Sequence, residues 1–169
     1  MKKIIIRYGT YAFLCAFLLF IVVLYVGLGL DFALQEVLGY LTIITSLVFI
    51  FPAVKSYREN VNNGVVSFKT GLLIGLAISA LAGIGFAIAD TLYLVFINPD
   101  FAQQYFEYSV EKMENELPLA EFEIKKAELE GQIAQYSNPA FNAIVMFLTV
   151  FLIGTLISII SAFILQRKK

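Results

Sequence analysis

The sequence predicts an all-α integral membrane protein: a four-helix bundle with an extracytoplasmic helical hairpin between spans three and four. Of its 169 residues, 60% are hydrophobic and only 15% are charged, whereas a soluble domain has about 45–50% apolar and about 25% charged residues. Four apolar stretches are each long enough to cross about 30 Å of hydrocarbon at 1.5 Å per residue. The basic and acidic residues are separated between alternate connecting segments. The whole chain is expected to form one membrane domain.

The first two predicted spans cover residues 8–30 and 37–54. Residues 8–30 carry no charge, and they follow a Met-Lys-Lys start like that of a signal peptide. The apolar run is longer than a signal core and no small-residue cleavage motif follows it, so we interpret it as a retained span. The second stretch is short for a span, and Pro52 near its end is interpreted as marking the exit from the span.

The third and fourth predicted spans cover residues 71–97 and 140–165. Residues 71–97 are long enough to tilt in the bilayer and contain one charged residue, Asp90. Residues 140–165 contain none. Asp90 is therefore the only charged side chain predicted to lie within the hydrocarbon.

The positions of Lys and Arg predict the orientation. If there are four spans, nine of the twelve basic residues fall on one side: Lys2, Lys3, Arg7, Lys55, Arg58, Lys69, Arg167, Lys168 and Lys169. Basic loops are retained in the cytoplasm during insertion. We therefore expect both termini and the loop 55–70 to lie in the cytoplasm.

A stripe of small residues predicts how the helices pack. In a bilayer, helices associate by close packing, which small side chains permit. The third span carries such residues every four positions, and the fourth has a shorter series: Gly71, Gly75, Ser79, Gly83 and Ala87, then Gly154, Ser158 and Ala162. We interpret these two faces as contacts within the bundle, with a homodimer interface as the alternative.

Residues 98–138 form the predicted outer segment, which contains nine acidic residues and three lysines. Asn98-Pro99 and Asn138-Pro139 bracket it, and a residue before proline avoids the helical region. Apolar residues on both sides of Pro118 recur at helical intervals, which predicts two short amphipathic helices. Their acidic face suits a cation or a basic partner; the alternative is a face that only keeps the segment solvated.

The residue inventory argues against catalysis. The chain has no His and one Cys, Cys15, so it lacks the usual ligands of a structural metal site and any nucleophile–histidine pair. Intramembrane aspartyl chemistry would need a second carboxylate beside Asp90. We predict no enzyme activity, no cofactor and no metal, and the net charge of −1 gives no reason to expect nucleic-acid binding.

Asp90 is the residue that demands an explanation. A carboxylate at the centre of a span costs roughly 2.5–3.5 kcal/mol on insertion scales, and such residues often carry function. Asp90 lies eight residues before Asn98, about 12 Å from the outer boundary, where the cost is lower. A structural role with Tyr93, Tyr25 or water as its partner is one interpretation; an ion or proton path is the other.

The order of these features resembles a bacterial family of small four-span membrane proteins, the domain of unknown function 4199. Three places carry the likeness. They are Lys55-Ser56-Tyr57-Arg58 with Gly64, Ser67-Phe68 and Gly71; Asn98-Pro99 before a Glu-rich helix; and Asn138-Pro139 leading into a span with Gly154, Ser158 and a basic tail. The resemblance implies a bacterial inner-membrane protein with four membrane helices and brings no activity, ligand or catalytic residue.

Two functional hypotheses follow from the sequence. The first is a non-enzymatic structural or interaction role through the bundle and the acidic outer hairpin, with the lipid bilayer and a membrane-protein partner or a second copy as its contacts. The second is a small ion- or proton-coupled carrier or channel that uses Asp90. The position of Asp90 near the outer boundary favours the first.

Overall fold

The computed structural model describes residues 1–167 and confirms the all-α fold: no β-strand occurs in this range, and Lys168 and Lys169 of the predicted basic tail lie outside it. The elements are α1 (Lys2–Val26), α2 (Phe32–Leu47), α3 (Ile50–Asn60), α4 (Phe68–Leu92), the π-helical turn η1 (Tyr93–Ile97), α5 (Phe101–Glu116), α6 (Leu119–Tyr136) and α7 (Pro139–Leu165). Four helical segments are long and apolar enough to cross a membrane, as predicted: Lys2–Val26, Phe32–Asn60, Phe68–Ile97 and Pro139–Leu165.

The helical segment that carries the second predicted span, residues 37–54, extends beyond these residues at both ends. It begins at Phe32, because the Asp31 side chain accepts a hydrogen bond from the Ala33 N–H at 2.8 Å and caps the helix. At the other end the chain continues past Pro52 to Asn60. The helix is interrupted at Val48 and Phe49 instead, between α2 and α3. Proline has no N–H for the carbonyl four residues earlier, which is that of Val48, and it is tolerated in the first turn of the helix that follows.

Helix α4 is the centre of the bundle, with α1 on one side and α7 on another. Its Gly85 lies against α1, where an added Cβ would lie 2.7 Å from the Phe13 carbonyl oxygen. Its Gly71 lies against α7, where an added Cβ would lie 3.1 Å from the Ala162 Cβ. Isoleucines and Phe86 complete the buried core of α4 between these neighbours.

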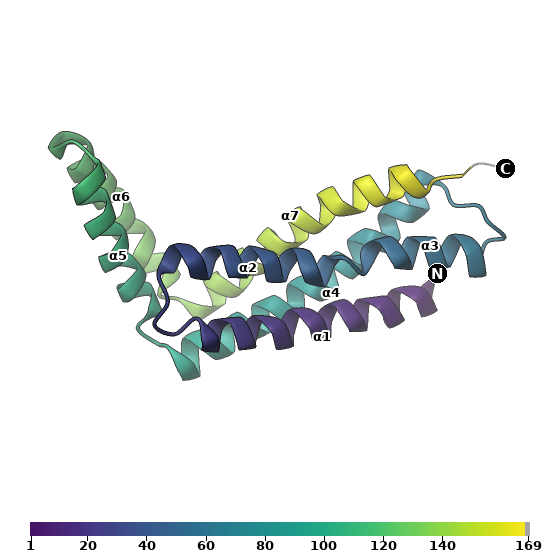
Figure 1. The fold of residues 1–169 in the computed structure, drawn as a ribbon, viewed down its shortest axis with the longest axis horizontal. Helices are drawn as coiled ribbons and strands as arrows, with labels where there is room; N and C mark the ends of the chain where they lie inside the picture. The colour runs from purple at the N-terminus through teal and green to yellow at the C-terminus, as the bar shows by residue number, and fades with distance from the viewer. Residues whose placement is uncertain (168–169) are drawn as a thin grey trace.

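The two ends of the bundle are built differently (Figure 1). The N-terminus, the connection between α3 and α4, and the C-terminal end of α7 lie at one end. There Val66 and Arg167 exchange backbone hydrogen bonds of 3.2 and 2.9 Å, and Arg58 donates to the Leu165 carbonyl at 3.4 Å. Helices α5 and α6, which we call the arm, project from the opposite end (Figure 1).

The base of the arm is held by aromatic side chains. Phe32 of α2 packs against Phe101, Tyr105 and Tyr108 of α5, with ring centroids 5.8, 5.7 and 5.0 Å apart. Phe101 also contacts Tyr93 of η1 at 5.8 Å. Edge-on and tilted aromatic pairs at such separations are favourable. The arm is therefore seated on the start of α2 and the end of the third span.

Replacing Gly75 with Ala tests the packing of α4 on α7. An added Cβ would overlap Ser158 Oγ and lie 2.6 Å from Ser158 Cβ; such overpacking costs about 1–3 kcal/mol. We expect Gly75→Ala to lower the midpoint of thermal unfolding in detergent. Gly39→Ala is the matched control, because no atom lies within 4 Å of its added Cβ. Equal midpoints for the two variants would contradict this packing.

Candidate functional site: a cavity at the base of the arm

A cavity of about 510 Å³ lies at the arm end of the bundle. Residues of α1, α2, α4, η1, α5, α6 and α7 line it, so every part of the fold except α3 contributes to its walls. Helices α2 and α7 of the bundle and α5 and α6 of the arm supply most of the residues in its walls. Ligand pockets in proteins are typically about 300–1,000 Å³, so the cavity is large enough for a small organic molecule.

Asp90 lies in the wall of this cavity. The side chain is half-buried, and its carboxylate accepts no hydrogen bond from any residue between 1 and 167. No hydrogen bond joins Asp90 to Tyr93 or Tyr25 in this structure: the bond of the Tyr93 hydroxyl is with Asn98 at 3.2 Å, and Tyr25 is 67% exposed. The carboxylate of Asp90 therefore has no hydrogen-bond partner within residues 1–167 and is available to a molecule in the cavity.

The other polar groups of the cavity come mainly from α2, α6 and α7. Glu36 is exposed and supplies a second carboxylate at the rim. Gln35, Gln132, Asn142 and Thr149 supply amides and a hydroxyl. Of these, Asn142 donates to the Tyr136 carbonyl, and Thr149 donates to the Val145 carbonyl at 2.9 Å. No Lys or Arg lines the cavity as the structure describes it, so its fixed charge is negative.

The π-helical turn η1 begins three residues after Asp90 in the chain. Such turns insert a residue into the helical register and often occur at functional sites. Here the turn leaves Tyr93 buried at 2% exposure in the cavity wall. The Asn98 N–H then donates to the Tyr93 carbonyl at 2.8 Å and closes the turn. The third span therefore changes geometry at the depth of the cavity.

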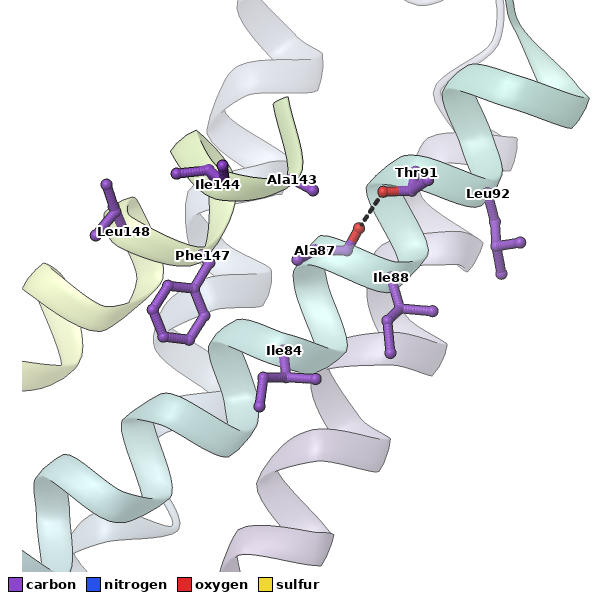
Figure 2. Close-up of a pocket in the computed structure, with 9 residues that line it drawn as sticks. All are labelled: Ile84, Ala87, Ile88, Thr91, Leu92, Ala143, Ile144, Phe147 and Leu148. Atoms are coloured by element: carbon purple, nitrogen blue, oxygen red, sulfur yellow. Dashed lines mark hydrogen bonds between the residues drawn. The ribbon is translucent and has the colours of Figure 1, made fainter. Parts of the chain in front are cut away.

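A second groove on the bundle offers no free polar group. Figure 2 shows a wide apolar groove between α4 and α7, lined among others by Ile84, Ile88, Ala143 and Phe147. Its hydroxyl, that of Thr91, is already bonded to the Ala87 carbonyl at 2.8 Å (Figure 2). Ala87, the last residue of the small stripe, lines this groove. The groove is therefore an apolar surface rather than a polar site.

The remaining residues of the predicted small stripe lie between α4 and α7. Gly71 meets Ala162, and Gly75 meets Ser158. A Cβ added to Gly154 would lie 2.5 Å from the Ser79 Cβ, and a Cβ added to Gly83 would lie 2.9 Å from the Phe147 Cδ2. Both serines bond to carbonyls of their own helices, Ser79 to Gly75 at 2.9 Å and Ser158 to Gly154 at 2.6 Å. The two helices therefore meet by van der Waals contact, with no hydrogen bond between these serines.

Sequence reasoning did not identify several residues that matter here. Gly9 lies against Leu81 and Gly85 against Phe13, so α1 also packs closely on α4. The signal was present in α1, where the buried Gly9, Ala12 and Ala16 follow helical spacing. Glu36 and Asn142 had no such signal, because only the folded bundle brings them to the same cavity as Asp90.

No cluster of three or more His, Cys, Asp or Glu side chains that could hold a metal occurs among the described residues. Cys15 is a free thiol on α1.

Comparison with known protein families identifies the family of this chain. The model of a family described as "Protein of unknown function (DUF4199)" matches residues 7–167. The chain belongs to this family. The match covers all four spans and the arm, so the DUF4199 domain includes both the bundle and the cavity at the base of the arm. No curated protein and no solved structure matches this DUF4199 chain.

The unpartnered carboxylate of Asp90 should reduce the stability of the bundle. A half-buried charge without a hydrogen bond carries a desolvation cost. We expect Asp90→Asn, which keeps the size of the side chain, to stabilise the protein by about 1 kcal/mol. This is less than the roughly 2.5–3.5 kcal/mol of a charge at the centre of a span, because the side chain is only half-buried. Asp100→Asn is the control, since Asp100 is exposed and its side chain caps nothing. A lower unfolding midpoint for Asp90→Asn would show that the carboxylate has a stabilising partner.

Proposed function

We propose that this DUF4199 protein is a non-enzymatic membrane protein that holds the arm outside the membrane to bind another protein. The exposed acidic surface of the arm carries this proposal. Glu107, Glu111, Glu123, Glu128 and Glu130 are all exposed, as are the large apolar side chains of Leu119 and Ile124 at 76% and 64%. A surface that combines like charges with exposed apolar side chains is typical of an interaction site.

The distribution of charge supports an orientation with the arm outside. The end opposite the arm holds the N-terminus, the α3–α4 connection and the end of α7 (Figure 1), together with Lys2, Lys3, Lys55, Lys69 and Arg167. Positive residues remain on the cytoplasmic side. In a bacterial cell this arrangement corresponds to an inner-membrane protein with both termini in the cytoplasm.

A partner with a basic external segment fits the arm. The two lysines of α6 do not neutralise the arm: of the two, only Lys125 forms an ion pair with a described residue, Glu121, at 2.9 Å. A second copy of the chain is a less suitable partner: its arm would carry the same negative charge, and the small stripe of α4 already contacts α7 in the same chain. We therefore propose another membrane protein as the partner.

A carrier that uses Asp90 has less support. Asp90 lines a cavity at the arm end of the bundle, and the residues that line this cavity do not extend to the opposite end. The opposite half is filled by side chains with no exposed surface, among them Ile50, Val54, Ile74 and Ile78. A transport path would require α4 and α7 to separate where they pack most closely.

The test is photocrosslinking in native membranes from one fixed position on the arm. We expect a discrete heteromeric adduct whose yield falls at least several-fold in the triple variant Glu123→Gln/Glu128→Gln/Glu130→Gln and on raising the salt concentration, because the attraction is screened. The opposite change, Lys125→Gln/Lys126→Gln, should preserve or raise the yield.

Two results would refute the proposed function. One is an adduct of equal yield in both charge variants, which would mean that the acidic surface does not recognise the partner. The other is the absence of any adduct apart from lipid.

A further inference from the structure

We propose that the cavity at the base of the arm is a binding site for a lipophilic organic cation, a molecule with a delocalised or quaternary positive charge and an aromatic or aliphatic body. This inference concerns the cavity and does not depend on the partner of the arm. It rests on three features of the same space: unpaired negative charge, aromatic faces and an apolar wall.

The negative charge of the cavity favours a positively charged ligand. Asp90 has no hydrogen-bond donor within residues 1–167, and Glu36 adds a second carboxylate at the rim. The three lysines of the arm, Lys112, Lys125 and Lys126, do not line the cavity. An anion would be repelled by the two carboxylates, since the cavity holds no counter-ion for it. A cation would be attracted to them and would serve as the counter-ion of Asp90.

The aromatic residues favour a bulky cation over a metal ion. Phe32, Phe101, Tyr93 and Tyr105 all line the cavity and contact one another at centroid distances of 5.7 to 6.4 Å. Aromatic faces attract organic cations by cation–π interaction, most strongly where water is excluded. A metal ion would need several oxygen ligands grouped together, and no such cluster occurs among the described residues.

The apolar wall indicates the body of the ligand. Phe20 and Leu24 of α1, Ile43 of α2, and Val145 and Met146 of α7 line the same cavity. Met146 gives this wall a flexible, polarisable side chain that adapts to different shapes. A volume of about 510 Å³ suits a hydrophobic body attached to the charge.

Gly39 offers a way to fill the cavity without disturbing the fold. It lines the cavity on α2, and no atom lies within 4 Å of a Cβ added there. Gly131 of α6 has equally open surroundings but does not line the cavity. Gly39→Leu and Gly131→Leu are therefore a matched pair that differ in whether the new side chain occupies the proposed site.

The experiment measures the binding of tetraphenylphosphonium and tetraphenylborate, two ions of the same shape and opposite charge, to the full chain in micelles of an uncharged maltoside detergent. Equilibrium dialysis against empty micelles corrects for partitioning. We expect saturable binding of one tetraphenylphosphonium per chain, with tetraphenylborate at least tenfold weaker. Asp90→Asn and Gly39→Leu should each weaken binding of the cation at least tenfold, and Gly131→Leu should leave it unchanged.

Three results would overturn the proposal. They are binding of the cation no greater than to empty micelles, equal binding of the two ions, and unchanged binding of the cation by Gly39→Leu. The Gly39→Leu measurement decides the matter even if Asp90→Asn alters the fold, because no atom lies within 4 Å of a Cβ added at Gly39. Circular dichroism of each variant identifies any loss of helix.

Discussion

The close approach of α4 and α7 is the contact on which the rest of this structure depends. Lipid tails are as apolar as leucine, so these helices gain little from the hydrophobic effect and must fit together closely. Gly75 accommodates Ser158, and Gly154 accommodates Ser79, so each helix supplies the space that the other fills. Because both serines bond within their own helices, the contact needs no polar partner across the interface.

This contact also explains why the two ends of the molecule differ. The helices meet closely from Gly71 to Gly83, and by Ala87 an open groove lies between them (Figure 2). Toward the arm, α7 lines the cavity together with α2. The other end is fastened by Arg58 on the Leu165 carbonyl and by the backbone pair of Val66 and Arg167. Packing at one end thus leaves room at the other for Asp90 and the aromatic base of the arm.

The sequence predicted the spans well because length and hydropathy determine them locally, but Pro52 shows where local reasoning ends. A proline at a helix exit and one in the first turn of a resumed helix look alike in sequence, and only the fold shows that the helix continues to Asn60. Asp90 stood out because a lone charge in a span is costly. Its cavity could not be foreseen, since Glu36, Asn142 and Phe101 reach it from three other helices.

Cysteine accessibility tests this account most directly, in a Cys15→Ala background so that no native thiol reacts. Gly39→Cys places a thiol in the cavity, and Ser158→Cys places one in the α4–α7 contact. A membrane-impermeant maleimide added outside intact cells should label Gly39→Cys and leave Ser158→Cys unreacted until the protein is denatured. Labelling of Ser158→Cys in the folded protein, or of Gly39→Cys only from the cytoplasmic side, would contradict a bundle closed by α4 and α7 and open at the arm.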